Sequence, residues 1–215
     1  MEGESQTEII RKTYARATLN PSKDEFVREI NSARGLSFLD IGCGENPRMS
    51  VGLKKGDLWV GCDPHIKEEN ITGSYVHVHT SSANNPDSKL IVFNSDAASV
   101  PGFAPDWITC IAPNPKDVVD DKIINYDLDK FFDSNKKQHF LVVVDNRTKE
   151  AELFKKDAIK HIKKFLHDLN FNLISSDEID DLGDYLRTNI NYKPNSADLG
   201  VSGNQYLLFV KPKGR

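Results

Sequence analysis

One stretch of the chain, residues 36–47 (Leu-Ser-Phe-Leu-Asp-Ile-Gly-Cys-Gly-Glu-Asn-Pro), restricts the possible folds more than any other. Its apolar run is too short, and ended too abruptly by glycine, for a helix, which favours a buried strand of a parallel sheet. Gly42 and Gly44 can take backbone angles closed to other residues, so the chain can turn sharply after the strand. Because β-carbons are missing there, a ligand can lie against the main chain at the sheet edge where open α/β folds bind their ligands.

Three later apolar runs are also followed by polar or turn-forming residues; they are residues 58–63, 90–97 and 107–115. Asp63 ends the first of them, 23 positions after Asp40. It is placed to accept hydrogen bonds from two ribose hydroxyls. Asp96 follows the second. The tips of parallel strands meet on one edge of a sheet, so we expect these three carboxylates to converge around one ligand.

In order and spacing, residues 36–212 resemble the class I S-adenosylmethionine-dependent methyltransferases. Asp40-Ile-Gly-Cys-Gly is similar to that family's first motif, which cradles the methionine part of the cofactor. Asp63 matches the ribose-binding acid, and Asp96-Ala97 resembles the pair that contacts adenine. The resemblance implies S-adenosyl-L-methionine as the cofactor. The cofactor-binding residues that we expect are Asp40, Gly42, Cys43, Gly44, Asp63, Pro64, His65, Asp96, Ala97, Ile111 and Ala112.

Two alternatives to this interpretation stay open at this point. A dinucleotide-binding Rossmann enzyme requires a third glycine after Gly44 that opens a long helix, but Pro47 lies where that glycine falls. The second alternative is an α/β core whose glycines carry no function.

The chain length and the residue pattern predict an α/β protein with a single methyltransferase-like domain over residues 1–215. Residues 1–34 form an N-terminal helical extension in this prediction, and residues 35–215 form a Rossmann-like core. The core is expected to be a largely parallel seven-stranded sheet with helices on both faces and the last strand antiparallel. The expected strands are 36–41, 58–62, 90–94, 106–112, 140–144, 170–175 and 205–210, and the expected helices are 5–18, 22–33, 127–134 and 150–169.

Composition limits where the protein works and what it binds. No apolar run approaches the roughly 20 residues that cross a bilayer, and the acidic N-terminus lacks a secretion signal. Cys43, Cys62 and Cys110 lie in or beside predicted strands, which favours buried thiols in a reducing cytoplasm. A net charge of -4 argues against a broad nucleic-acid-binding face. We therefore expect a cytoplasmic protein without a membrane partner.

The tip of the fourth predicted strand, Ala112-Pro113-Asn114-Pro115-Lys116, is where the family places substrate-side residues. The prolines stiffen this turn, so it could aim the amide of Asn114 at an acceptor amine, although a plain strand-ending turn explains the same residues. Asp145 follows the fifth predicted strand. The resemblance implies that Asn114 and Asp145 are the catalytic-side residues.

Three functional classes follow from these features. The first is methyl transfer to an unidentified acceptor, with a small molecule favoured because the chain is acidic and no aromatic residue at the Asn114 tip can stack on a base. The second is an RNA or tRNA methyltransferase, since Pro113-Asn114-Pro115-Lys116 is partly similar to the Pro-Asp-Pro-Trp-Pro-Lys pattern of the tRNA guanine-N7 methyltransferases. The third is a binding module that keeps the cofactor site without catalysis.

Two further clusters favour ordinary structural interpretations. His77 and His79 share one face of a possible strand at 75–79, but no cysteine or carboxylate pattern accompanies them, so we expect no metal. Five lysines on the amphipathic helix at 150–169 are expected to form its solvated face, with phosphate binding as the alternative: Lys155, Lys156, Lys160, Lys163 and Lys164. The loop at 180–203 is expected to be mobile.

Overall fold

The computed structural model describes residues 17–44, 53–66, 88–111, 113–144, 149–176 and 205–214. The chain forms two compact units, Met1–Pro101 and Gly102–Arg215. Residues 5–16 of the expected helix at 5–18, the possible strand at 75–79 and the loop at 180–203 lie outside the described residues. The expectation of a single domain stays a prediction, and each unit is described by itself below.

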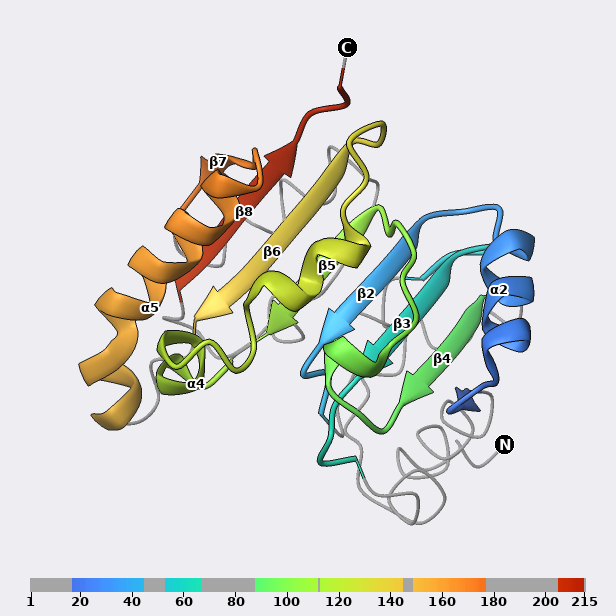
Figure 1. The fold of residues 1–215 in the computed structure, drawn as a ribbon, viewed down its shortest axis with the longest axis horizontal. Helices are drawn as coiled ribbons and strands as arrows, with labels where there is room; N and C mark the ends of the chain where they lie inside the picture. Colours follow the sequence, from blue (N-terminus) through green and yellow to red (C-terminus); the bar gives the residue numbers. More distant parts are fainter. Residues whose placement is uncertain are drawn as a thin grey trace, which may run out of the picture. The chain divides into compact units, whose positions relative to one another are not determined.

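Unit 1, Met1–Pro101, contains a four-stranded parallel sheet in the order β1-β4-β3-β2. Its strands are β1 (Thr18–Leu19), β2 (Ser37–Ile41), β3 (Leu58–Cys62) and β4 (Lys89–Phe93). All five residues of β3 are buried, as are the last four of β2 and of β4, because these short runs are mostly apolar. Figure 1 shows the arrowheads of β2, β3 and β4 at one edge of this sheet.

The two-residue strand β1 replaces the end of a helix that the sequence analysis extends to residue 18. Thr18 and Leu19 pair with β4, and the N–H of Asn20 donates to the carbonyl of Val92 at 2.9 Å. Pairing with β4 explains the difference, because it holds Thr18 and Leu19 in an extended conformation. Asn20 follows with a φ of 43°, which lies outside the right-handed helical region.

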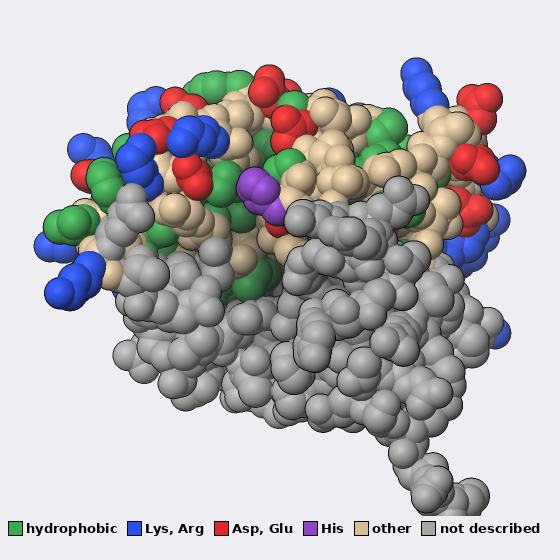
Figure 2. All heavy atoms as spheres, turned by 90° about the horizontal axis from the view of Figure 1, so that it is seen from below, with side chains coloured by type: hydrophobic (Ala, Val, Ile, Leu, Met, Phe, Trp, Pro, Cys, Tyr) green, Lys and Arg blue, Asp and Glu red, His purple; other side chains and the backbone are tan. Residues whose placement is uncertain are grey.

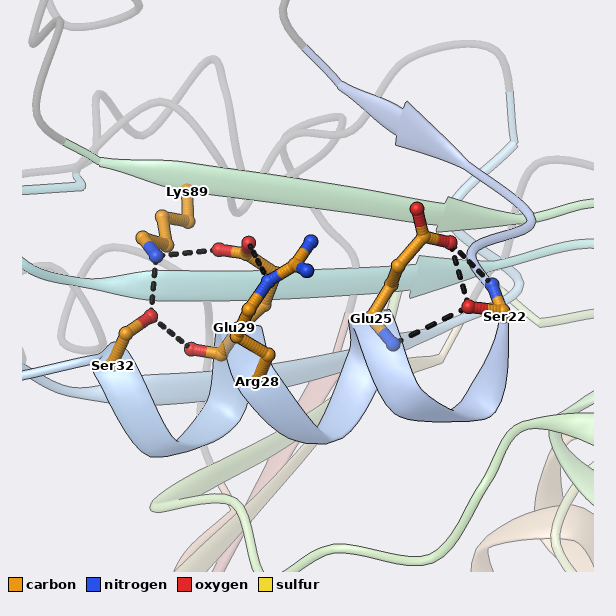
Figure 3. Close-up of polar contacts among 6 residues, drawn as sticks. All are labelled: Ser22, Glu25, Arg28, Glu29, Ser32 and Lys89. Atoms are coloured by element: carbon orange, nitrogen blue, oxygen red, sulfur yellow. Dashed lines mark hydrogen bonds and ion pairs between the residues drawn. The ribbon is translucent and has the colours of Figure 1, made fainter.

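Helix α2 (Lys23–Ser32) begins where the sequence predicts, because Ser22 caps it. The hydroxyl of Ser22 accepts from the N–H of Glu25 at 3.3 Å, while the Glu25 carboxylate accepts from the N–H of Ser22 at 2.9 Å. These bonds form a capping box. The Ser22 hydroxyl also donates to the Glu25 carboxylate at 2.7 Å, and this bond, followed by the one from the Ser22 N–H, lowers the pKa of Glu25. Figure 3 shows this cap and, at the other end of α2, the Lys89 ammonium between the carboxylate of Glu29 and the hydroxyl of Ser32.

Helix α2 covers one face of the sheet in unit 1. The ring of Phe26 meets the ring of Phe93 edge-on, with centroids 5.4 Å apart, and Lys89 lies on the same face two strand residues from Ile91. The register places Val60 and Cys62 of β3 on this face as well. The opposite face therefore carries the alternate residues, among them Trp59 and Gly61.

Replacing Ser22 with alanine is expected to lower the free energy of unfolding by about 1 kcal/mol, because the first turn of α2 loses its capping acceptor. Urea denaturation followed by far-ultraviolet circular dichroism measures this change. Ser22→Asp is the matched control, since aspartate keeps an acceptor at the cap and is expected to stay near the wild-type midpoint. Equal midpoints for Ser22→Ala and the wild type would contradict the assigned cap.

Unit 2, Gly102–Arg215, contains four strands in the order β5-β6-β8-β7. They are β5 (Trp107–Ile111), β6 (Gln138–Val144), β7 (Asn172–Ser175) and β8 (Gln205–Lys211). β5 and β6 run parallel, whereas β8 is antiparallel to both β6 and β7. All seven residues of β6 are buried. His139, in β6, stacks its ring on Trp107 with centroids 4.1 Å apart and planes 4° from parallel.

The described residues of unit 2 form one short α-helix, one 3₁₀ helix and one long α-helix. They are α4 (Pro115–Val119), η3 (Tyr126–Phe131) and α5 (Lys149–Asp168). The predicted helix at 127–134 is therefore 3₁₀, and the long helix agrees with the prediction. Helix α5 packs on α4 and β7 through a buried apolar stripe that consists of Ala151, Ala158, Ile162, Phe165 and Leu166.

The structure confirms the predicted fold class: it is a largely parallel α/β fold whose last strand, β8, is antiparallel. All seven predicted strands are present, and β1 is an additional short one. Cys43, Cys62 and Cys110 are buried, as predicted. Of the helices that the structure describes, none combines the length and the apolar character needed to cross a lipid bilayer.

Candidate functional site

The candidate site lies within unit 1, where three parallel strands end at one edge of the sheet (Figure 1). Each strand is followed by residues that the sequence analysis selects. Gly42, Cys43 and Gly44 follow β2, Asp63, Pro64 and His65 follow β3, and Asp96 and Ala97 follow β4.

The glycine loop after β2 is fixed to the end of β3. The N–H groups of Gly42 and Cys43 both donate to the carbonyl of Cys62, at 2.8 and 3.3 Å. Gly42 and Gly44 have φ angles of 65° and 59°, in the left-handed region that favours glycine. A Cβ on Gly42 would meet no atom of the described residues within 4 Å. The positive φ therefore requires glycine here, and the described residues leave room beside this glycine for a ligand.

Asp63 joins the loop after β2 to the loop after β3. One oxygen of its carboxylate accepts from the N–H of Gly44 at 3.0 Å, and the other accepts from the N–H of His65 at 2.7 Å. The N–H of Asp63 donates to the carbonyl of Phe93 at 3.2 Å, which holds it against β4. Each carboxylate oxygen keeps a further lone pair. The half-buried Asp63 can therefore hold the loop and still accept from a ligand.

One buried thiol at this edge senses the charges of the three carboxylates. Burial first, and then the charges of Asp40, Asp63 and Asp96, raise the pKa of Cys62 to about 12, while the N–H of Gly42 opposes them. Burial first, and then the charge of Asp40, also raise the pKa of Cys43 well above its usual value. Both thiols are therefore protonated at neutral pH, which excludes them as nucleophiles.

Asp40 itself is 1% exposed, so it lies beneath the edge rather than on it. Its carboxylate stands in register with Gly61 of β3, and its carbonyl lies 3.8 Å from the thiol of Cys62. Asp40 lies in β2, one residue before the strand ends and the glycine loop begins, so it can contact the loop from beneath.

Asp96 and Ala97 begin the 3₁₀ helix η2 (Ala97–Ser99). One carboxylate oxygen of Asp96 accepts from the N–H of Ser99 at 3.0 Å and from its hydroxyl at 2.9 Å. Asp96 is therefore the cap of this helix, and its exposed carboxylate also faces solvent. Ala97 is 7% exposed, so its side chain contributes packing and only its backbone can bond a ligand.

The remaining predicted site residues belong to unit 2. Ile111 ends β5 and is half-buried. Asn114 caps α4: its side-chain oxygen accepts from the N–H of Lys116 at 3.0 Å, and Pro115 takes the first helical position. The predicted stiff turn is thus the start of a helix. Ala112 and Asp145 lie outside the described residues.

The histidines give no metal site in the described part of the chain. His65 is exposed, and it contacts Asp63 through its backbone N–H. His77 and His79 lie outside the described residues. Within residues 17–44, 53–66, 88–111, 113–144, 149–176 and 205–214, no three His, Cys, Asp or Glu side chains are grouped to hold a metal ion.

The sequence analysis missed two residues beneath the glycine loop, Trp59 and Gly61. A Cβ on Gly61 would lie 2.2 Å from the benzo ring of Trp59 and 2.8 Å from the sulfur of Cys43. A glycine inside a five-residue strand is a signal for such a close approach, and it stands in the sequence at the middle of the Trp-Val-Gly-Cys run. No pattern in the sequence predicts which side chain fills the space.

The fold of this chain is similar to the folds of solved methyltransferase structures. No protein-family model and no curated protein matches the sequence. Among solved structures, the 16S rRNA (adenine(1408)-N(1))-methyltransferase from Catenulisporales acidiphilia matches with a TM-score of 0.57 and 14% identity, over 93% of this chain and 98% of that one. A mutant of the same enzyme matches with a TM-score of 0.54 and 12% identity, over 91% and 95%. At these identities the likeness shows the fold alone.

Proposed function

We propose that this chain, which has the fold of the class I S-adenosylmethionine-dependent methyltransferases, binds S-adenosyl-L-methionine at the carboxyl edge of β2, β3 and β4 and transfers its methyl group to a small-molecule acceptor. One observation carries the proposal. The loop of Gly42 and Gly44, with open space above its main chain, is tied by Asp63 to the end of the neighbouring strand. This arrangement supports a nucleoside-bearing ligand that lies on the loop with its hydroxyls at Asp63.

The charge at this edge fits the chemistry of the proposed cofactor. Asp40 lies in β2 next to its end, and Asp63 and Asp96 follow β3 and β4, so the three supply acceptors and negative charge along this edge. S-adenosyl-L-methionine presents a sulfonium, an ammonium, two ribose hydroxyls and an exocyclic amine, all of them cationic or hydrogen-bond donors. Such groups are stabilised by carboxylates, whereas the pyrophosphate of a dinucleotide is repelled by them.

The proposed roles follow the order of the strands. Asp63 accepts from the ribose hydroxyls, and Asp96 accepts from the adenine amine while the backbone of Ala97 bonds the ring. Gly42, Cys43 and Gly44 carry the methionine part on their main chain, with Asp40 orienting them from below. Pro64 and His65 flank the ribose. Ile111 and Ala112 remain proposed contacts near the sulfonium, on the strength of sequence position alone.

Methyl transfer demands little covalent help from the chain. When bound, the cofactor supplies an electrophilic methyl that an acceptor lone pair displaces in line. The residues of the chain hold the acceptor in position and exclude water. Asn114 and Asp145 remain the proposed acceptor-side residues. The capping bond of Asn114 uses its side-chain oxygen. The two amide N–H groups of Asn114 therefore remain to donate hydrogen bonds to polar atoms of the bound substrate.

A small-molecule acceptor is favoured over RNA because carboxylates neutralise the lysines near Asn114. The ammonium of Lys116 lies 2.5 Å from Asp120, and that of Lys122 lies 2.9 Å from Asp117. On the face in Figure 2, basic and acidic side chains alternate over the described residues and form no continuous basic area. A polyanion would have to displace these pairs, which costs affinity.

Two measurements on the purified chain test the proposal. Isothermal titration with S-adenosyl-L-methionine detects binding, and incubation of the chain with methyl-labelled cofactor and fractionated cell extract locates the acceptor. Label in small molecules is the expected result. Label in RNA would replace the proposed acceptor class, with salt-sensitive RNA binding as its companion. Binding without transfer would indicate a non-catalytic module, and absence of binding would overturn the proposal.

A further inference from the structure

A bulky side chain occupies the space that the missing side chain of Gly61 leaves open. The position of a Gly61 Cβ is 2.2 and 2.6 Å from two carbons of the benzo ring of Trp59 and 2.8 Å from the sulfur of Cys43. Side chains two residues apart on a strand share a face, so the indole of Trp59 lies along β3 toward its carboxyl end. There it reaches the residue at the centre of the glycine loop.

Buried residues surround Gly61, the Trp59 ring and the Cys43 sulfur. Trp59 is 1% exposed and Cys43 is 7% exposed, so neither side chain can move into solvent to make room. In the register of the sheet, Gly61 stands between Asp40 of β2 and Val92 of β4, both buried. A side chain added at Gly61 would therefore displace its neighbours, because a close-packed interior has no free space to accommodate it.

The indole of Trp59 carries an energetic penalty, but its second ring fills a space that a smaller side chain would leave empty. The ring N–H of Trp59 is buried and has no hydrogen-bond partner among the residues that the structure describes. A buried donor without a partner is destabilising, and phenylalanine would avoid that penalty. Phenylalanine lacks the second ring, however, and it is this ring that fills the space above Gly61. The benzo ring is therefore the part of Trp59 that matters at this place.

Cys43 links this packing to the glycine loop. It lies between the two glycines of positive φ, and its own N–H donates to the carbonyl of Cys62. Its buried thiol has a raised pKa and is unreactive, which leaves packing as its contribution. Its sulfur and the benzo ring of Trp59 both lie within 3 Å of the position of a Gly61 Cβ, so Cys43 is placed beneath the loop next to the indole, while Asp63 holds the loop through the N–H of Gly44.

We propose that Trp59 and Gly61 are positioning residues for the cofactor loop: the indole of Trp59, seated over Gly61, supports Cys43 and thereby holds Gly42–Gly44 in the conformation that receives the cofactor. This inference rests on the proposed function and adds to it two residues that do not touch the cofactor. It predicts that changes beneath the loop alter cofactor affinity through Cys43.

Gly61→Ala is the direct test. The added methyl overlaps the benzo ring and the sulfur, so it is expected to displace Cys43 and weaken S-adenosyl-L-methionine binding by roughly tenfold or more. Trp59→Phe in the same chain removes the overlapping ring carbons. The double variant Trp59→Phe/Gly61→Ala is therefore expected to bind more tightly than Gly61→Ala alone, a rescue that general destabilisation does not produce.

Val60→Ala is the matched control for stability. Val60 is fully buried on the same strand but on the opposite face, away from Cys43. Its truncation is expected to lower the melting temperature without changing the dissociation constant. If Val60→Ala and Gly61→Ala weaken binding equally at equal loss of melting temperature, the effect is general destabilisation and the proposal is wrong.

A second readout is independent of the cofactor. Thiol alkylation, located by peptide mass spectrometry, is expected to modify Cys43 faster in Gly61→Ala than in the wild type, and the double variant is expected to restore protection. Unchanged alkylation of Cys43 in Gly61→Ala would overturn the inference. Absence of S-adenosyl-L-methionine binding by the wild type would instead overturn the proposed function, while the alkylation rates still decide whether the indole positions the loop.

Discussion

Replacing Asp63 with alanine is expected to weaken S-adenosyl-L-methionine binding by about a hundredfold, the largest effect that we expect from any one substitution at the site. Two losses combine. The ribose hydroxyls lose a charged acceptor, and each such hydrogen bond contributes about 1.5–3 kcal/mol. The N–H groups of Gly44 and His65 also lose the carboxylate that fixes them at 3.0 and 2.7 Å. Isothermal titration measures the change.

Asp63→Asn separates these two contributions, because it preserves shape and one acceptor oxygen but removes the charge. Its amide places N–H groups where a backbone N–H now donates, so it too is expected to bind weakly, with less loss of stability than alanine. Asp157→Ala, an exposed carboxylate on α5, is the matched control and is expected to leave the dissociation constant unchanged. If Asp63→Ala binds as tightly as the wild type, the ribose assignment is wrong.

Acid is expected to destabilise the protein through His139. Burial, followed by the charge of Lys137, lowers the pKa of this imidazole to about 4, against an opposing contribution from the backbone of Asp106. In the unfolded chain the pKa returns to about 6.5. Between these values the unfolded state binds more protons, so the free energy of unfolding falls as the pH falls from 6.5 to 4. The stabilisation is complete above pH 6.5, and about 3 kcal/mol is lost at pH 4.

Urea denaturation at pH 7.5 and at pH 4 measures this loss. His139→Phe keeps an aromatic ring against Trp107, now 4.1 Å from the imidazole, but cannot be protonated. Its free energy of unfolding is therefore expected to depend less on pH than that of the wild type. His167→Gln is the comparison variant, because it removes an imidazole that is 86% exposed rather than buried. The same pH dependence in the wild type and in His139→Phe would contradict a buried neutral imidazole.

Local sequence predicts the strands of this protein well, since an apolar run of about five residues between polar residues has few other solutions. β2, β3, β4 and β5 follow the predicted runs within one or two residues. The glycine loop is equally local: Gly42 and Gly44 adopt positive φ as their positions after β2 indicate. Helix α5 is set by its own apolar period.

Short elements are predicted less well, because they depend on single contacts. The sequence analysis reads Asn114 and Pro115 as a turn, yet Pro115 starts α4 because the Asn114 side chain accepts the N–H of Lys116. β1 forms only because β4 offers an unpaired edge to Thr18 and Leu19. In both cases the deciding partner is one hydrogen bond or one neighbouring strand.

The sequence by itself determined the strands, the left-handed glycines and the carboxylates at the carboxyl ends of β2, β3 and β4, because each depends on residues adjacent in the chain. Tertiary structure alone decided that Asp63 holds Gly44, that the indole of Trp59 fills the space over Gly61, and that His139 lies stacked on Trp107. These contacts join residues from different strands, or fill a space whose shape the whole sheet defines. Packing in three dimensions selects such partners, and no spacing along the chain encodes them.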